Sequence, residues 1–525
     1  MNRSKTAALV VLFGALTFHV VGVMSYLLRN GRLSIVPIYD DVGYLIDGLG
    51  RLAIFDRAGI WACLADFYTH PAHAPTSSIT SVLGLSLSAG AVWGPYLLSA
   101  GWIVLVLLLG LLALRRTSIG VAVGILVAAL AAPMFGVVLA EFRPDPVWGL
   151  LVGFALIVSA TVDAVTMTRG KLVALGLLFG AAVVAKPTAA PASVLVLAIG
   201  FGTQFVLSLW QQRAWSVVLV ARVAALMLLG AACLIVPYLI TNGSGTLDYI
   251  RAVTAGDSMW KLHFSLREQI TYYLNKGTAS LMLGWIWYAG IPLAAICLGL
   301  LVRARDKRAL GAMVGIAAGV ATSYLIVTVS AVKSLMIGSI LYGTIIAAAV
   351  WCMGQIAARV SLRGRAALVI GILVFATQWA PRVGMIHRDD PSMIATEEAS
   401  RAAFPPLLET LQANPAAKVL ITVPGPVYAG TLDFLSRQQG VAREFTAAYT
   451  WGTWEQFQQG VAAADVIVLS EPGMVGQSLA YAFPSVPFQA RLLDELRSSP
   501  EFKGRPVFTD KQGRSVWLFV RGRRG

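Results

Sequence analysis

Two adjacent acidic residues, Asp40 and Asp41, are the first candidates for chemistry in this sequence. They come shortly after a long apolar segment, and the chain of 525 residues holds only 26 Asp and Glu side chains. Paired carboxylates at the point where a chain leaves the membrane can form the acidic centre of an active site at the membrane surface. The alternative is that they cap a short interfacial helix, because Asp favours the positive end of a helix dipole.

Three basic residues are candidates for binding an anionic ligand. Arg143 lies between Glu141 and Asp145, Lys186 precedes a proline, and Lys333 stands near the start of a late apolar segment. A cation close to lipid costs a few kcal/mol and usually has an anionic partner or ligand, and a phosphate would suit all three. The alternatives are that Arg143 pairs with a neighbouring acid, that Lys186 reaches to the interface, and that Lys333 marks the end of a span.

Further candidates for substrate contacts are Asp145, Tyr44, which belongs to the stretch around the acidic pair, and His263 in the loop 241–279. That loop interleaves charged and aromatic residues, so it can fold over a site and hold a ligand against an aromatic face. It can equally form an interfacial helix with an aromatic belt. His263 alone is weak evidence, because a single His beside apolar residues is more often structural.

Composition places these residues in a multi-pass membrane protein. The chain is 57% hydrophobic and 13% charged, with apolar runs long enough to cross a hydrocarbon core of about 30 Å. The four cysteines are scattered without a CxxC pair, so neither a disulfide framework nor a zinc site is indicated.

The net charge of +15 reflects orientation in the membrane and not a nucleic-acid partner. The segment 386–525 carries 14 basic and 14 acidic residues, so the whole excess lies in the apolar part. There the basic residues recur at alternate turns between apolar segments. This alternation predicts about eleven spans, a cytoplasmic N-terminus and an outer C-terminal domain. The spans are expected at 6–28, within 78–114, and at 118–139, 146–166, 172–185, 188–209, 216–240, 280–302, 309–330, 334–357 and 366–385.

The acidic pair falls in an outer loop at 29–77. This loop contains two amphipathic pieces, 44–55 and 60–68, which can lie flat in the interface. Residues 78–114 are too long for one simple span and are interrupted by Gly94 and Pro95. We expect a short half-inserted helix there, followed by one span.

The chain is expected to divide into a membrane domain at 1–385 and a soluble extracytoplasmic α/β domain at 386–525. Strands are predicted at 418–423, 465–470 and 515–520, and helices at 431–439, 454–464 and 488–498. Apolar strands alternate with helical stretches over about 140 residues, which is enough for a separate core. The sequence assigns this domain no chemical role.

The order of these motifs resembles the GT-C membrane glycosyltransferases. The resemblance rests on an acidic pair in the first outer loop, on the stretch His70-Pro71-Ala72-His73-Ala74-Pro75, and on Arg143-Pro144-Asp145 and Lys186-Pro187-Thr188. It extends over about residues 1–385 and is similar to the branch of protein O-mannosyltransferases and lipid A aminoarabinose transferases. The acidic motif departs from the Asp-Glu pair that is frequent there, and the His-Pro-rich motif that some members carry before a late span has no clear counterpart.

The resemblance implies transfer of a sugar from a polyprenyl-phosphate carrier to an extracytoplasmic lipid, glycan or protein acceptor. Asp40 or Asp41 would be the acid that acts at the acceptor, and Arg143, Lys186 and Lys333 would be candidates for the carrier phosphate. Deprotonation of the acceptor needs one carboxylate, for which we favour Asp41, and a single base suits direct displacement with inversion. No cofactor is required, although paired acids and a phosphate can hold a divalent cation.

The expected location is a bacterial inner membrane, with membrane lipids and the carrier as partners and no nucleic acid. The rival interpretation is a transporter or flippase for a lipid-linked saccharide. A transporter usually places charged residues near the middle of the membrane and shows internal repeats. The notable charges here lie at the outer ends of the spans, which favours the transferase.

Overall fold

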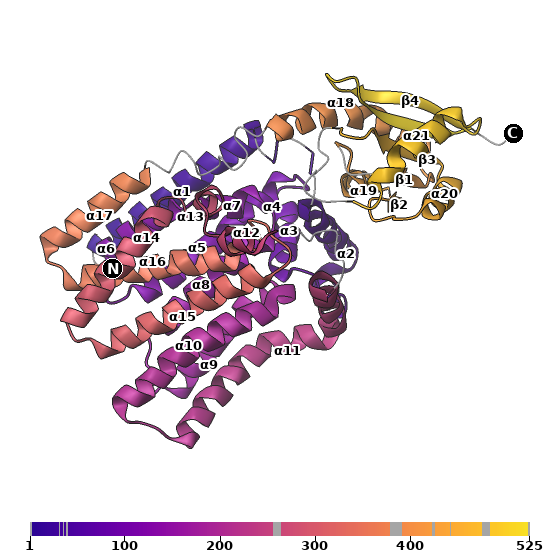
Figure 1. The fold of residues 1–525 in the computed structure, drawn as a ribbon. Coiled ribbons are helices and arrows are strands. Elements are labelled where there is room, and N and C mark those ends of the chain that lie inside the picture. The colour runs from indigo at the N-terminus through magenta and orange to yellow at the C-terminus, as the bar shows by residue number, and fades with distance from the viewer. Residues whose placement is uncertain are drawn as a thin grey trace.

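The computed structural model describes residues 3–30, 32–34, 36–37, 40–255, 264–377, 391–422, 426–441, 443–474 and 483–522. A body of helices is joined to a small C-terminal part that contains a β-sheet (Figure 1). The helices of the body are α1 (Arg3–Asn30), α2 (Asp40–Thr69), α3 (Pro75–Leu87), α4 (Trp93–Leu98), α5 (Ala100–Ala113), α6 (Ile119–Leu130), α7 (Pro133–Ala140), α8 (Pro144–Ser159), α9 (Arg169–Val184), η1 (Pro187–Ala189), α10 (Ala190–Gln212), α11 (Val217–Ala255), α12 (Leu266–Thr271), α13 (Lys276–Leu283), α14 (Trp285–Arg303), α15 (Lys307–Val329), α16 (Ser339–Arg359) and α17 (Leu362–Thr377).

Seven helices of the described part are long and apolar enough to cross a membrane. The number becomes eight if α6 and α7, which meet at 63°, form one broken span. Helices α8, α9 and α17 are each 16 residues long, shorter than the roughly 20 residues of a typical span. The predicted count of eleven therefore remains a prediction.

The segment 78–114 contains a short helix followed by a span-length unit, as expected, while half-insertion of the short helix remains a prediction. Helix α3 ends at Leu87, the chain turns through Gly90 at φ 85°, and the apolar stretch Trp93–Ala113 then follows as a span-length unit. Glycine adopts a positive φ readily, and the preceding Ala89 also has a positive φ of 52°, so two successive residues make the reversal. The short helix is thereby held beside the outer loop that precedes it.

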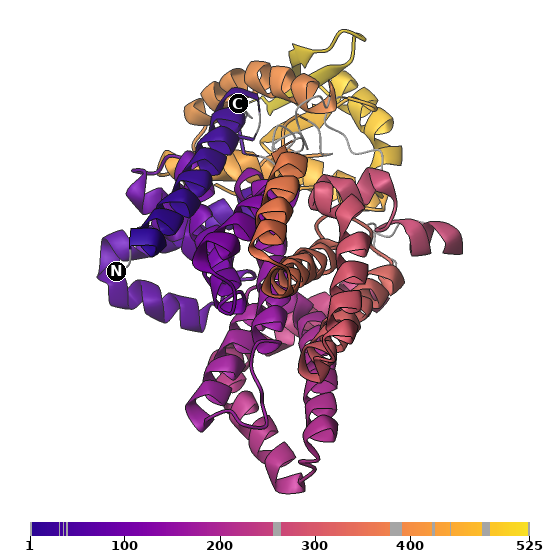
Figure 2. The same ribbon diagram turned by 90° about the vertical axis from the view of Figure 1, so that its left-hand side faces the viewer.

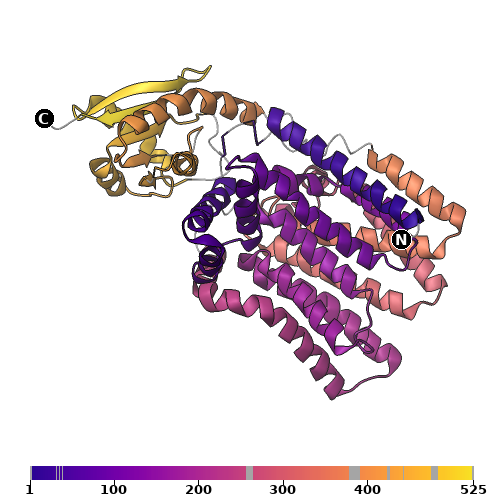
Figure 3. The same ribbon diagram turned by 180° about the vertical axis from the view of Figure 1, so that it is seen from behind.

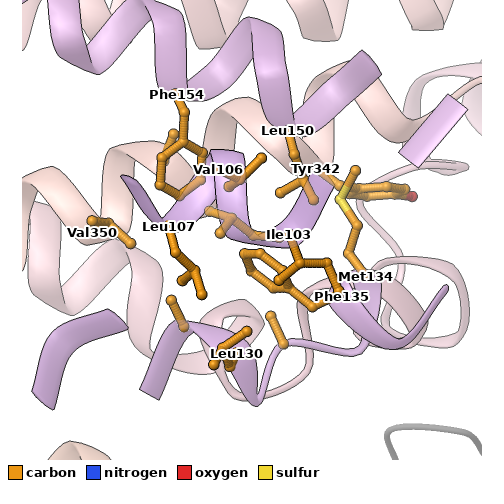
Figure 4. Packing of buried hydrophobic residues seen from close by; sticks show 14 of the residues in the cluster. Ile103, Val106, Leu107, Leu130, Met134, Phe135, Leu150, Phe154, Tyr342 and Val350 are labelled. Carbon is orange, nitrogen blue, oxygen red and sulfur yellow. The ribbon is translucent and has the colours of Figure 1, made fainter. Parts of the chain in front are cut away.

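Helices α8 and α16 form the centre of the body. Every residue of α8 is buried, and its side chains interlock with those of α5, α6, α7 and α16 around Phe135, Leu150 and Phe154 (Figure 4). A helix that is apolar on all sides is stable only when other helices surround it. This packing fixes the position of the α8 N-terminus, where Arg143 and Asp145 lie.

The backbones of α8 and α16 touch through glycines. A Cβ on Gly149 would lie 2.0 Å from the Ser339 carbonyl oxygen, and one on Gly343 would lie 2.1 Å from the Gly149 carbonyl oxygen. Gly153 meets Gly343 in the same way, so the two helices run parallel. Small residues allow this close approach between helices in membranes. The starts of α8 and α16 therefore lie at the same end of the body.

The segment 29–77, which was expected to form an outer loop, folds largely into one helix. The two predicted amphipathic pieces are the halves of α2, which bends at Gly59, where φ is 80°. Its first half packs on α3, because Gly48 leaves room for Ser81. The acidic pair occupies the first turn of α2.

The C-terminal part contains a sheet of five strands in the order β2-β1-β3-β5-β4. Strands β2, β1 and β3 are parallel, while β5 is antiparallel to both β3 and β4. Its elements are α18 (Pro391–Ala413), β1 (Val419–Ile421), α19 (Ala429–Gln438), β2 (Phe445–Ala447), α20 (Trp454–Ala463), β3 (Val466–Ser470), η3 (Val486–Phe488), α21 (Gln489–Ser498), β4 (Phe502–Thr509) and β5 (Ser515–Arg521). The three predicted strands and three predicted helices are present, whereas α18, β2 and β4 were not predicted.

Helix α19 joins the two parts of the molecule by lying against α2 (Figure 1). The buried Thr431 hydroxyl donates to the carbonyl oxygen of Pro37, and Arg401 Nη2 donates to that of Ser34 at 2.9 Å. Phe434 is fully buried in the same apolar cluster as Val42. The two turned views show the sheet beyond one end of the helical body (Figures 2 and 3). The segment leading into the acidic pair is therefore held by both parts.

Candidate functional site

Asp40 and Asp41 begin α2 but face different surroundings. The Asp40 side chain is 65% exposed, whereas that of Asp41 is 1% exposed. Asp41 Oδ2 accepts hydrogen bonds from the Tyr96 hydroxyl at 2.7 Å and from the Phe142 backbone N–H at 3.1 Å. Both donors belong to other elements, so Asp41 links α2 to α4 and to the α7–α8 turn. It does more than cap its own helix.

Arg143 brings the acidic pair together with Glu141. Its Nη1 lies 2.9 Å from Asp40 Oδ2, and its Nε lies 3.7 Å from Asp41 Oδ1 and 3.5 Å from Glu141 Oε2. Arg143 is extended, and Pro144 then starts α8 at a position where a helix tolerates proline. Of the two acids that flank Arg143 in the sequence, Glu141 pairs with it. The other partners of Arg143 are Asp40 and Asp41 of α2.

Asp145 pairs with Lys186 instead. Lys186 Nζ forms an ion pair with Asp145 Oδ1 and lies 5.3 Å from the centre of the Trp148 ring. Asp145 is in the first turn of α8, and Lys186 lies in the turn between α9 and α10. The sequence expectation that these charges share one end of the body agrees with this contact.

Tyr44 and His73 flank the charged groups. The Tyr44 ring packs edge-on against Phe142 with centroids 6.5 Å apart, and His73 packs against Tyr249 at 5.0 Å. Burial lowers the pKa of His73, and the charge of Lys186 lowers it further. The imidazole is therefore neutral at pH 7 and can exchange hydrogen bonds without adding charge.

Burial also raises the pKa of the Asp41 carboxyl above its ordinary value. The charge of Glu141 acts in the same direction, while Arg32 and Arg143 oppose it. Among the described residues Asp41 Oδ1 accepts no hydrogen bond. Asp41 thus carries its charge at a higher cost than a solvent-exposed carboxylate.

Lys333 and His263 are not gathered into this group. Lys333 is 2% exposed, and its ammonium donates to the carbonyl oxygens of Val327 at 2.8 Å and Thr328 at 2.6 Å. These carbonyls lie at the end of α15, so this contact is the span-end role that was the alternative for Lys333. Burial lowers the pKa of Lys333. His263 lies outside the described residues.

Sequence reasoning did not single out Arg32 or Tyr96. Arg32 is buried, and its Nη2 lies 2.7 Å from Glu141 Oε2, while Tyr96 holds Asp41. A signal for Arg32 was present, because a basic residue on the predicted outer side of the first span departs from the positive-inside tendency. Tyr96 follows the Gly94-Pro95 break and had no comparable signal.

The acids of the site are occupied by basic partners. Within the described ranges no three His, Cys, Asp or Glu side chains converge as metal ligands. Asp40 and Glu141 both pair with Arg143, and Asp145 pairs with Lys186. In the described part of the chain these carboxylates therefore neutralise basic side chains.

An apolar groove of about 450 Å³ lies beside the segments that carry His73 and Lys186. Its walls come from the second half of α2, from α3, from the end of α9 and from the middle of α11. Ala72 in the wall is next to His73, and Val184 is two residues before Lys186. The Thr76 hydroxyl donates to the Ala185 carbonyl oxygen at 3.0 Å, which fixes the wall beside Lys186. The groove is lined by Ile60, Cys63, Leu64, Phe67, Tyr68, Pro71, Ala72, Pro75, Ile79, Val82, Leu83, Val184, Pro237, Tyr238 and Thr241.

Comparison with solved structures identifies the architecture. ArnT from Cupriavidus metallidurans in the apo state superimposes with a TM-score of 0.63 at 14% identity, with 98% of each chain covered. The same enzyme bound to undecaprenyl phosphate gives 0.58 at 15% identity, covering 98% of this chain and 96% of that one. The Archaeoglobus fulgidus oligosaccharyltransferase gives 0.51 at 12% identity, covering 98% of this chain and 74% of that one. The chain has the GT-C fold.

This GT-C architecture confirms the expected fold class, an α-helical membrane protein with a C-terminal α/β part. No protein-family model matches the sequence, and no curated protein matches it. The likeness therefore lies in the three-dimensional arrangement. The GT-C match extends over the C-terminal part as well, because it covers nearly the whole chain.

Proposed function

We propose that this protein is a glycosyltransferase that moves a sugar from a polyprenyl-phosphate carrier to an extracytoplasmic lipid, glycan or protein acceptor. The observation that carries the proposal is the junction of an exposed acid, two cations and an apolar groove at one end of the helical body. A lipid-linked sugar has the matching parts: a prenyl chain, a phosphate and an anomeric carbon. ArnT, which shares the fold, has been solved with undecaprenyl phosphate.

The carrier would lie with its prenyl chain in the apolar groove and its phosphate at Lys186. Val184 and Ala72 bring the end of the groove to within two residues of Lys186 and His73. The ammonium group of Lys186 is partly exposed and pairs with one carboxylate, so it can also accept a phosphate oxygen. Lys333 is less suited to this role, because backbone carbonyls already hold its ammonium group.

The transfer is a single displacement. The acceptor hydroxyl oxygen attacks the anomeric carbon while a carboxylate takes its proton, and the bond from that carbon to the phosphate oxygen breaks. The phosphate leaves with the electron pair, and Lys186 stabilises its negative charge. One base and no covalent intermediate give inversion at the anomeric carbon.

The structure leads us to propose Asp40, in place of Asp41, as the base. An acceptor can reach the exposed Asp40 carboxylate, whereas Asp41 is enclosed by Tyr96, Phe142 and Arg143. Asp41 would then position the turn at Phe142, and with it the Arg143 guanidinium that orients Asp40. Both acids would be required, for different reasons.

The test is transfer of radiolabelled sugar from purified polyprenyl-phosphate sugars to a cell-envelope acceptor fraction. Asp40→Asn should lower kcat by about 10²- to 10⁴-fold with an unchanged unfolding midpoint. Asp56→Asn is the matched control, because Asp56 lies exposed in the same helix without a described partner, and it should transfer normally. Wild-type rates in Asp40→Asn would exclude Asp40 as the base. Carrier movement across vesicles without any transfer would favour the transporter.

A further inference from the structure

We propose that the opposite end of the helical body holds a binding site for a phosphate group, such as the headgroup of an anionic phospholipid. A cavity of about 280 Å³ opens where α5, α8 and α16 end and α15 begins. Its charged and polar walls are formed by Arg116, Thr117, Thr161, Arg308, Gln355 and Arg359. This end lies away from the C-terminal sheet (Figure 1). On the proposed topology it faces the cytoplasm.

The three arginines come from three separate elements. Arg116 follows α5, Arg308 is in the first turn of α15, and Arg359 ends α16. Guanidinium groups bind phosphate oxygens through paired N–H donors, and several that line one cavity can hold one phosphate from different sides. Basic pockets between membrane helices are known to bind anionic lipid headgroups.

Only one of these arginines has an acidic partner in the described part of the chain. Arg359 pairs with Asp306 and also donates to Gln355 Oε1 at 2.7 Å. Arg116 and Arg308 are exposed and form no described ion pair, so their charges remain available to a ligand. Asp306 offsets one of the three positive charges, which leaves an excess of two around the cavity.

The positive-inside tendency alone does not explain why arginines gather around this cavity. Arg303 and Lys307 are exposed basic residues at the same end of the body, yet neither lines it. Arg115, the neighbour of Arg116, donates to the Thr161 carbonyl oxygen at 3.1 Å and so satisfies a helix end. Arg116 has no such described bond. Leu114 and Trp351 add apolar lining, which would suit the first part of a lipid acyl chain.

The experiment measures ligand-induced shifts of the unfolding midpoint in the full-length protein in neutral detergent. The probes are phosphatidylglycerol, phosphatidylcholine and inorganic phosphate, with chloride at matched ionic strength as the reference. The double variant Arg116→Gln/Arg308→Gln is compared with Arg303→Gln/Lys307→Gln, which removes the same charge outside the cavity. We expect the cavity variant to bind the anion at least about tenfold more weakly and the control to bind as wild type does.

The responses to the different probes distinguish the source of the phosphate group. A shift with phosphatidylglycerol alone identifies a lipid headgroup, and a shift with inorganic phosphate as well identifies a site for free phosphate groups. The proposal is overturned if wild type responds to neither anion, or if the control variant loses as much affinity as the cavity variant. Titration of each folded variant by native mass spectrometry gives the affinity directly if one variant is too unstable for melting.

Discussion

At the scale of single residues, the site is a chain of ion pairs with one exposed carboxylate. Glu141 forms ion pairs with Arg32 and Arg143, and Arg143 also contacts Asp40 and Asp41. Asp145 forms a separate ion pair with Lys186. Four acids and three bases leave one negative charge in excess. A negative charge on the exposed Asp40 carboxylate suits a site that must accept a proton.

Asp41 makes stability depend on pH in a predictable direction. Its pKa is raised in the folded state, so the folded protein holds this proton more tightly than the unfolded chain does. The contribution is fully present below the ordinary Asp pKa of about 3.9 and is lost as pH rises through the higher folded value. Unfolding midpoints of wild type and Asp41→Asn should therefore diverge as pH rises above about 4, with wild type losing stability relative to the variant. A pH-independent difference would contradict the raised pKa.

The buried pair of Arg32 and Glu141 should show strong coupling. Their side chains are 7% and 4% exposed, and Nη2 lies 2.7 Å from Oε2. Arg32→Met leaves the Glu141 carboxylate buried beside Asp41 with one positive charge fewer to balance it. This should cost about 3–5 kcal/mol of unfolding free energy. Adding Glu141→Gln should recover much of this loss. A double-mutant cycle by thermal or chemical unfolding measures the coupling, and additive losses would show that the pair is independent.

Sequence alone is enough to propose most members of the site but not their pairing. Asp40, Asp41, Arg143, Asp145 and Lys186 could be assigned to one side, because basic turns define the opposite side. The choice of partner depends on how α2, α8 and the α9–α10 turn approach one another. Sequence spacing holds no information about that approach, which is why Arg143 could not be assigned to Asp40 in advance.

At the scale of elements, α19 is a support for the acidic turn. The Thr431 hydroxyl is buried and donates to the Pro37 carbonyl oxygen three residues before Asp40, and Gly430 leaves room for Val42. No periodicity in the sequence could reveal this contact, because its two sides are 394 residues apart. The helix itself was predicted, at 431–439.

Removing this hydroxyl should therefore reduce transfer. Thr431→Val leaves the Pro37 carbonyl unpaired at a cost of about 1–3 kcal/mol, which would loosen the turn and lower kcat more than it changes the carrier KM. Thr431→Ser should restore the rate. Gln438→Ala is the control, since Gln438 donates to the Gly90 carbonyl oxygen at 3.1 Å on the exposed side of the same helix. Equal losses in Thr431→Ser and Thr431→Val would argue against a role for the hydroxyl.

The elements β2, β4 and α18 were missed for a common reason. Strand β2 has three half-buried residues and β4 is mostly exposed, so neither presents an apolar run. Helix α18 contains Pro405 and Pro406, which usually indicate the end of a helix. Their structure depends on pairing with strands and helices that the local pattern does not reveal.

At the scale of the whole molecule, the two charged ends should lie on opposite sides of the membrane. The proposed topology places the sheet outside and the arginine cavity inside. In a cysteine-free background, Lys511→Cys in the β4–β5 turn should react with an impermeant maleimide on intact inner membranes. Lys307→Cys at the start of α15 should react only after permeabilisation. Both positions are exposed, so burial would not obscure the result. Labelling of both from one side would refute this orientation.

The contact between Thr431 and Pro37 also constrains when the protein can become active. The acidic turn is made early in translation, but its support follows 394 residues later. At about 5–20 residues per second, the ribosome needs roughly 20–80 s to supply it. During that interval the early helices can insert while the acidic turn still lacks this contact. The proposed active site would thus be complete only after Thr431 has been synthesised.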